Sequence, residues 1–321
     1  MFGKSRRLTA IVLVLGLAPL LPSEADAQDL RVTLLGTGTP TPRPDRFGPA
    51  TLVEAGSKIL LFDAGRGVSL RIWQLDIPLR DIDAVFVTHF HHDHISGLAD
   101  LWLTGWLPPP FGQRKQALQV LGPTGIKDVT QGLLAAYAQD IDLRTADEGL
   151  PRAGATFDVI EFSSSGSIYD QDGVKVTAFV VNHGELIKPA YGYRIDYAGR
   201  SVLISGDTKF DQRVIEAGNG VDVVIHEVVA AEERLFEKYP ALVAIKDHHT
   251  TPEEAGIVFH EIQPKLAVYT HLVRLSAPDI PELDLSDLVK QTRRTYQGPL
   301  VVGHDLMTIE VGENVVVYDR R

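Results

Sequence analysis

Histidine or aspartate ends six of the apolar, β-branched runs in this 321-residue sequence. These residues are Asp63, His89, His183, Asp207, His226 and His271. One such ending is ordinary, but six indicate strands whose ends meet at one edge of stacked sheets, where the sites of α/β folds lie. Runs of helical spacing, such as 66–76, 125–141 and 251–262, lie between the strands. The pattern predicts one α/β domain with a polar site at an edge.

The heptapeptide "THFHHDH" at 88–94 holds four of the eleven histidines in the chain. A polar surface loop would explain it, and so would a metal site. His89 and His91 are two positions apart and Asp93 and His94 are adjacent, so a tight loop can direct one pair to each of two metals. Imidazole and carboxylate bind zinc, iron or manganese, and the absence of cysteine excludes thiolate ligands. Further ligands are expected from the strand ends: His183, Asp207 and His271.

The N-terminus has the pattern of a secretory signal. Lys4, Arg6 and Arg7 precede the apolar run 8–21, and Ala25-Asp26-Ala27 follows it. This order predicts a signal peptide at 1–27 and a mature domain at 28–321. The run is short for a bilayer span, so a retained membrane anchor is the weaker alternative. The predicted location is periplasmic or secreted, without membrane attachment after cleavage.

The net charge of the chain bears on which partners it can bind. The formal net charge is −11, and no block of lysine and arginine is present. Binding to a nucleic-acid backbone normally rests on clustered basic residues, so no bulk nucleic-acid binding is expected. A local basic pocket could still hold a small anion. The sequence therefore predicts a small-molecule anionic ester as the substrate.

Five motifs resemble the metallo-β-lactamase fold superfamily. They are "LFDAG" at 61–65, "HxHxDH" at 89–94, "NHG" around His183, "SGDT" around Asp207 and "THL" around His271. The resemblance covers residues 30–308 and implies a four-layer αβ/βα sandwich of two mixed β-sheets flanked by helices. It also implies two divalent metal ions, zinc first, with iron or manganese as alternatives. The implied ligands are His89, His91 and His183 for one metal, Asp93, His94 and His271 for the other, and Asp207 as the bridge.

Finer motifs narrow the resemblance to one branch. "LLGTGTPTPRPDRFGPATLVEAG", "VIHE", "HHTTPEEAG" and "GHDLM" are similar to ribonuclease Z and its relatives, including secreted arylsulfatase-type enzymes. In that branch a glutamate and a histidine form a catalytic pair, which implies Glu227 and His249 here. His248 is the rival, and His249 is preferred because two threonines follow it. Asp93 is expected to orient the nucleophile as well as bind metal.

One departure from ribonuclease Z is visible in the sequence. That enzyme carries a long tRNA-gripping arm before the bridging aspartate, whereas "YGYRIDYAGRSVLISGD" turns directly through Ala198-Gly199. Together with export and acidity, this favours a secreted binuclear hydrolase of sulfate or phosphate esters, arylsulfatase-like or phosphodiesterase-like. Two metals about 3.5–4 Å apart would share a hydroxide as the nucleophile.

Three alternatives remain open. They are a β-lactam or lactone hydrolase, a ribonuclease Z-like nuclease, and a metal-binding protein without catalysis. A homodimer is possible by analogy with ribonuclease Z. Near the metal loop, Trp102, Trp106 and Phe111 are expected to form a lid or an aromatic pocket rim, or else ordinary core. His304 is a candidate for a supporting or substrate contact.

Overall fold

The computed structural model describes residues 30–320. The predicted signal peptide lies outside the described residues, so its existence and the expected secretion stay predictions. Within residues 30–320, no helix is long and apolar enough to cross a membrane.

Fifteen strands are present in the described part of the chain. They are Leu30–Gly36 (β1), Ala50–Ala55 (β2), Lys58–Phe62 (β3), Ala84–Phe86 (β4), Leu118–Pro123 (β5), Phe157–Phe162 (β6), Gly166–Gln171 (β7), Val174–Val180 (β8), Tyr191–Tyr197 (β9), Arg200–Ile204 (β10), Val223–Ala230 (β11), Leu266–Arg274 (β12), Leu300–Val302 (β13), Met307–Val311 (β14) and Val315–Asp319 (β15).

Helices and 3-10 turns connect these strands. The α-helices are Val68–Gln74 (α1), His92–Ile95 (α2), Leu98–Trp106 (α3), Ile126–Ala136 (α4), Ala138–Asp147 (α5), Gln212–Ala217 (α6), Glu233–Lys238 (α7), Val243–Lys246 (α8), Pro252–Ile262 (α9) and Leu285–Thr292 (α10). The 3-10 turns are Leu79–Asp81 (η1), Arg152–Ala155 (η2) and Pro240–Leu242 (η3).

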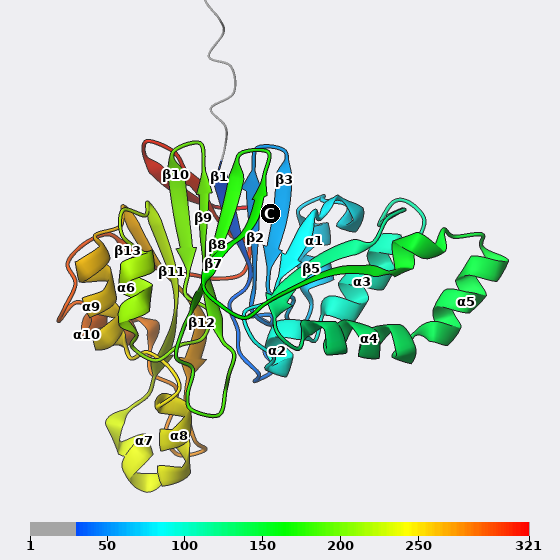
Figure 1. Cartoon of the computed structure of the whole chain (residues 1–321). Helices are drawn as coiled ribbons and strands as arrows, with labels where there is room; N and C mark the ends of the chain where they lie inside the picture. Colours follow the sequence, from blue (N-terminus) through cyan, green and yellow to red (C-terminus); the bar gives the residue numbers. More distant parts are fainter. Residues whose placement is uncertain (1–29, 321) are drawn as a thin grey trace, which may run out of the picture.

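The strands form two mixed sheets that face each other (Figure 1). The first sheet has the order β15-β14-β1-β2-β3-β4-β5-β6, and the second has the order β13-β12-β11-β10-β9-β8-β7. Strands β3 to β6 run parallel in the first sheet, as do β10 to β13 in the second. The remaining neighbours are antiparallel. The parallel halves bring several strand ends of the same sense to one edge, where the site lies.

Three apolar clusters fill the three interfaces between four layers. The first lies between the sheets and includes Val32 and Phe86 from one and Tyr193 and Val223 from the other. The second packs the first sheet against α1 and α3, and the third packs the second sheet against α6, α9 and α10. Figure 1 shows α1, α3, α4 and α5 on one side and α6, α9 and α10 on the other. The predicted αβ/βα sandwich is confirmed.

Some local predictions need correction. The single helix expected at 125–141 is two helices, because α4 ends at Ala136 and a new helix starts after Tyr137. Helices α7, α8 and α10 were not predicted from the sequence. They are short, and Pro240 divides the stretch 233–246, so no run is long enough for a helical period to be recognised.

The turn between β9 and β10 is as short as the sequence indicates. Ala198 and Gly199 both have positive φ, 49° and 74°, which is the backbone pattern of a two-residue hairpin turn. Tyr197 pairs with Arg200 directly across this turn. No inserted arm is present between these strands in the described chain.

Candidate metal centre

The histidine loop is held from both sheets. Strand β4 ends at Phe86, and the backbone oxygens of Val87 and Thr88 accept hydrogen bonds from the Tyr193 hydroxyl (2.5 Å) and the Tyr191 amide (3.1 Å) of the facing sheet. Asp63, at positive φ, accepts from the Thr88 amide at 2.8 Å. These bonds fix the start of the loop, so His89 leaves the strand in one orientation.

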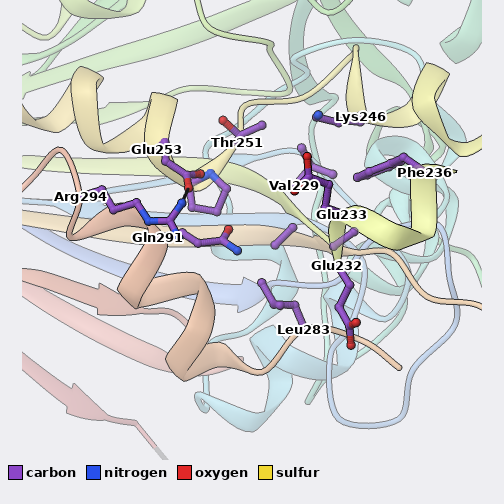
Figure 2. A pocket seen from close by; sticks show the side chains of 13 residues that line it. Val229, Glu232, Glu233, Phe236, Lys246, Thr251, Glu253, Leu283, Gln291 and Arg294 are labelled. Carbon is purple, nitrogen blue, oxygen red and sulfur yellow. Dashed lines mark hydrogen bonds and ion pairs between the residues drawn. The ribbon is translucent and has the colours of Figure 1, made fainter. Parts of the chain in front are cut away.

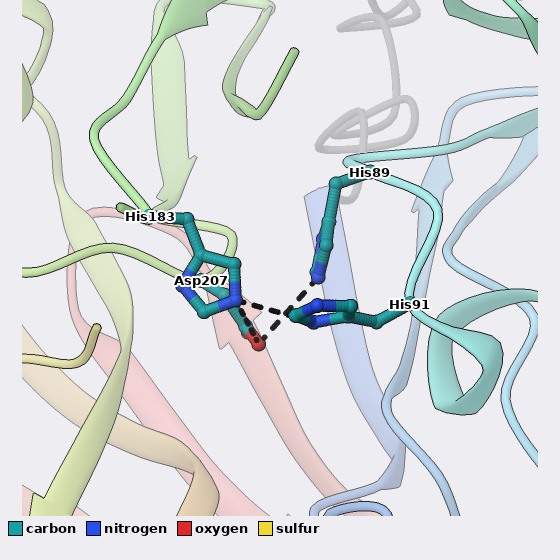
Figure 3. A group of neighbouring side chains, drawn as sticks. All are labelled: His89, His91, His183 and Asp207. Carbon is teal, nitrogen blue, oxygen red and sulfur yellow. Dashed lines mark hydrogen bonds and ion pairs between the residues drawn. The ribbon is translucent and has the colours of Figure 1, made fainter. Parts of the chain in front are cut away.

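The strand-end side chains converge on one point (Figure 3). Asp207 follows Gly206, whose φ of 62° turns the chain after β10. The Oδ2 atom of Asp207 lies within 3.8 Å of the Nε2 atoms of four histidines. These distances are 3.3 Å to His94, 3.4 Å to His271, 3.7 Å to His183 and 3.8 Å to His89. A carboxylate so placed between four imidazoles has the geometry that a bridging ligand requires.

A β-bulge directs His271 into this cluster. In the pairing of β11 with β12, Thr270 faces Glu227 and Leu272 faces Val228, so His271 is an extra residue with a positive φ of 42°. Bulges commonly re-aim a side chain beside an active site. The Nε2 atom of His271 is consequently 3.4 Å from Oδ2 of Asp93.

The electrostatics of the cluster favour the protonation states in which these side chains bind metal. Burial lowers the pKa of His89 well below its usual value and lowers that of His183 to about 4, which keeps both imidazoles neutral. Burial alone would raise the pKa of Asp207, but the surrounding histidines outweigh it and hold the pKa well below its usual value. Neutral imidazole and ionised carboxylate are the forms that bind metals.

The residues fit divalent metal ions. Three groups of side chains have ligand atoms within 4.8 Å of one another: His89, His91, His183 and Asp207; Asp93, His94 and His271; and Asp207, His249 and His271. In the described chain, the buried Nε2 atoms of His89 and His94 and Oδ1 of Asp93 have no hydrogen-bond partner. Buried polar atoms are normally satisfied, so these orphans agree with a metal as the missing partner. The first two groups match the predicted division of ligands, with Asp207 beside both.

A second set of contacts orients the ligands. His94 donates from Nδ1 to Asp63 at 2.7 Å, and His183 donates from Nδ1 to the carbonyl of His248 at 2.9 Å. Each bond leaves Nε2 facing the cluster, as in the carboxylate–histidine pairs around bound zinc. Thr88 contacts both Asp63 and Nδ1 of His89 at 3.0 Å.

We expect Asp63→Ala to weaken metal binding without removing a ligand. Loss of the carboxylate frees the His94 ring to rotate and to change tautomer, which typically costs about 10–100-fold in metal affinity. Competition with a chromogenic chelator would measure the affinity for zinc. Unchanged affinity would show that Asp63 serves only the backbone around Thr88.

Glu227 and His249 form a buried pair next to the cluster. His249 Nδ1 is 3.1 Å from Oε2 of Glu227, and Oε1 accepts from the Thr250 amide at 2.9 Å. Burial would lower the pKa of His249, but attraction to Glu227 outweighs it and raises the pKa. Thr251 caps helix α9 in a capping box with Glu254, which fixes the chain just after His249. The arrangement holds an imidazole with a raised pKa beside the ligand set.

Other sequence candidates lie elsewhere. His226 is buried against Phe259 and donates to the Glu227 carbonyl, so it does not join the cluster. His304 is about half-exposed and pairs with Asp319 at 3.1 Å. Its neighbour Asp305 was missed: its carboxylate accepts from the amides of Thr37 and Phe47, and it pairs with Arg71 at 2.9 Å. Asp305 thereby holds the loop that forms one wall of the site.

The predicted aromatic lid is absent from the pocket. Trp102 and Trp106 are fully buried in the cluster under α3, where Trp102 packs on Phe157 with ring centroids 4.4 Å apart. Phe111 packs on Trp73 at the surface and does not line the metal cavity. The i, i+4 spacing of the two tryptophans on α3 places both on its core face.

Trp102→Ala should therefore act on stability. Loss of a fully buried tryptophan leaves a cavity and costs about 3–5 kcal/mol of unfolding free energy. Phe111→Ala, at a site 42% exposed, should cost far less. Urea denaturation of both variants would compare them. A Trp102→Ala protein of normal stability with a raised KM would restore the lid role.

A cavity of about 460 Å³ opens onto the ligand cluster. Its walls include Thr39, Pro40 and Arg43 of the loop held by Asp305, and Leu272 to Ser276 at the end of β12 and just beyond it. Glu282 bridges the two arginines at its rim, at 2.6 Å from Arg43 and 2.6 Å from Arg274. The cavity thus joins a polar floor to walls that carry both cations and aliphatic side chains.

This fold and this cluster define a hydrolase that works with divalent metal ions. Residues 59–272 match the beta-lactamase superfamily domain. The chain belongs to the metallo-β-lactamase superfamily and is a metal-dependent hydrolase.

Ribonuclease Z is the name of several similar relatives. The chain is 31% identical to ribonuclease Z of Mycobacterium marinum over 88% of this chain and 99% of that one. It is 32% identical to ribonuclease Z of Mycobacterium bovis over 88% and 98%. Among solved structures, it resembles human tRNase Z, short form, with TM-score 0.66, 21% identity and coverage of 88% and 99%. The YhfI protein of Bacillus subtilis has TM-score 0.68, 19% identity and the same coverage.

These relatives contradict one prediction. A small-molecule substrate with no nucleic-acid partner is at odds with relatives that are ribonucleases. The prediction rested on a net charge of −11, which averages over the whole surface. A whole-chain charge says little about one cavity, where bound metal ions can supply positive charge even if lysine and arginine are sparse.

Proposed function

We propose that this chain is a metal-dependent phosphodiesterase that cleaves RNA. The observation that carries the proposal is the Glu227–His249 pair beside two adjoining ligand sets, in a chain similar to ribonuclease Z over nearly its full length. The seven proposed ligands are His89, His91, Asp93, His94, His183, Asp207 and His271. Zinc is the proposed metal, since histidine and carboxylate are its ordinary ligands.

Each group has a role in hydrolysing the diester. Bound divalent metals would supply Lewis acidity for the phosphate and for the attacking water. Asp93 and Asp207 would hold negative charge at the centre of the ligand set, and Asp93 would orient the attacking water. His249, whose pKa Glu227 raises, would donate a proton to the leaving oxygen as general acid. Asp63 and the His248 carbonyl hold two imidazoles in the tautomer that faces the site.

The short turn at Ala198-Gly199 bears on whether the RNA substrate is folded or single-stranded. With two residues between β9 and β10, the chain offers no projecting arm there to grip a folded RNA body. We therefore propose single-stranded RNA as the substrate. The predicted signal peptide would place this activity in the periplasm or outside the cell.

The test uses the purified, metal-quantified protein and a 5′-labelled single-stranded RNA. Because a hydrolase of this kind uses water as the nucleophile, we expect cleavage to continue when the 2′-hydroxyl at the scissile position is methylated. Cleavage by common contaminating ribonucleases, which attack through that hydroxyl, would stop. EDTA should abolish cleavage and zinc should restore it. Turnover of 4-nitrophenyl sulfate or nitrocefin with no cleavage of RNA would overturn the proposal and favour the sulfatase-type or lactamase alternative.

A further inference from the structure

A short helical segment lies between the two members of the catalytic pair. Residues 233–246, which we call the cap segment, comprise α7, η3 and α8 and connect the strand of Glu227 to the loop of His249. In Figure 1 this segment projects from the edge where the strand ends meet. Its position lets it contact anything that enters the metal cavity.

The cap segment has two different faces. On the outer side, Phe236 and Lys246 line a separate pocket, with the Lys246 ammonium 5.1 Å from the Phe236 ring (Figure 2). In that pocket Arg294 is paired with Glu253 at 2.7 Å. The outer face therefore borders a different pocket from the metal cavity. On the inner side, Leu242 and Ile245 line the metal cavity.

The inner face leaves aliphatic surface uncovered beside charged groups. Ile245 is 37% exposed and Leu242 is half-buried, although both belong to a cavity whose floor is histidine and aspartate. Leu272 and Val273, directly after His271, add apolar atoms to the same cavity. Apolar surface gathered in a concave site with a few polar groups is typical of a wall that a ligand covers.

We infer that Leu242 and Ile245 form the wall that contacts the nucleobase adjoining the scissile phosphate. The inference rests on the proposed function, because in RNA the base is the part with a large apolar face. Aliphatic side chains offer no hydrogen bonds to base edges, so the contact holds any base through its face and is tolerant of sequence. The cap segment thereby determines affinity for nucleosides and leaves the chemistry to the cluster.

Two chromogenic diesters test this wall independently of RNA cleavage. Thymidine 5′-(4-nitrophenyl phosphate) carries a base, and methyl 4-nitrophenyl phosphate carries none, while both release the same phenolate. For Leu242→Ala and Ile245→Ala in the metal-loaded protein, we expect kcat/KM to fall about fivefold to tenfold on the thymidine ester. The methyl ester should change less than about twofold. Ile245→Leu, which keeps the aliphatic volume, should retain activity on both.

Ile257→Ala is the matched control, because Ile257 is 40% exposed on α9 and does not line the cavity. Equal losses on both esters would overturn the inference and assign the cap segment a structural role. No loss on either ester would also overturn it. If the unaltered protein hydrolyses both esters in a metal-dependent way but does not cleave RNA, the proposed function fails while the wall is still judged by the ratio of the two losses.

Discussion

Asp207→Asn should abolish hydrolysis, with kcat/KM reduced roughly 1000-fold or more for every substrate. The Oδ2 atom of Asp207 is 3.3–3.8 Å from four histidine Nε2 atoms, so one substitution removes the charge that both ligand sets share. Asparagine keeps the shape of the side chain, and packing should therefore survive. The loss should appear as fewer than two metals per chain by elemental analysis.

Asp170→Asn is a suitable control, because Asp170 is an exposed carboxylate on β7 that pairs with Lys175 near the start of β8, at the opposite end of that strand from His183. It should retain both metals and full activity. The denaturant midpoint of Asp207→Asn, measured without metal, checks that the fold persists. Two retained metals together with normal turnover in the Asp207 variant would remove the bridging role from that residue.

The sequence was sufficient to predict the layered fold and the gathering of the ligand candidates. The gathering of the ligand candidates depends on local patterns, namely apolar runs of strand length with a polar residue where each run stops, whereas the layered fold was implied by the resemblance of the motifs. Asp63, His89 and Asp207 are such endings, and parallel neighbours place them at one edge. The motif resemblance then indicated which residues share a site, since spacing alone does not say which strands are adjacent.

Contacts between residues far apart in the sequence could not be predicted from the sequence. His271 enters the site through a bulge whose existence depends on the register between β11 and β12. The role of Asp305 depends on a loop more than two hundred residues earlier folding back onto it. The cap segment could not be recognised because Pro240 divides it into pieces of six residues or fewer. In contrast, the four-residue spacing of Trp102 and Trp106 is enough to predict that both are buried on one face of a helix.

The binding partner was the property that the net charge of the sequence predicted least well. A sum of −11 over the chain does not describe a cavity in which Arg43 and Arg274 share one carboxylate, Glu282, above a set of metal ligands. Whole-chain charge governs solubility and long-range steering. The affinity of one pocket for a phosphodiester depends on the few groups that line it, and those groups are brought together only by the fold.

His249→Ala should slow cleavage of RNA about 100–10,000-fold while both metals remain bound. The expectation follows from the pairing of Nδ1 with Glu227, which leaves Nε2 free to give a proton to the departing oxygen. A ribose oxygen is a poor leaving group and needs that proton, whereas 4-nitrophenolate leaves without it. Bis(4-nitrophenyl) phosphate should therefore be hydrolysed within about tenfold of the normal rate, and Glu227→Gln should show the same selectivity with a smaller loss.

The geometry also allows His249 to bind metal, because its ring nitrogen lies within 4.8 Å of ligand atoms of Asp207 and His271. The two roles differ in what the His249→Ala variant loses. A lost general acid affects only the substrate with the poor leaving group, since the metals and the attacking water are unchanged. A lost ligand lowers the metal content and slows both substrates together. Equal losses on RNA and on the nitrophenyl diester, with fewer metals per chain, would therefore show that His249 is a metal ligand. The general acid that protonates the leaving oxygen would then be another group.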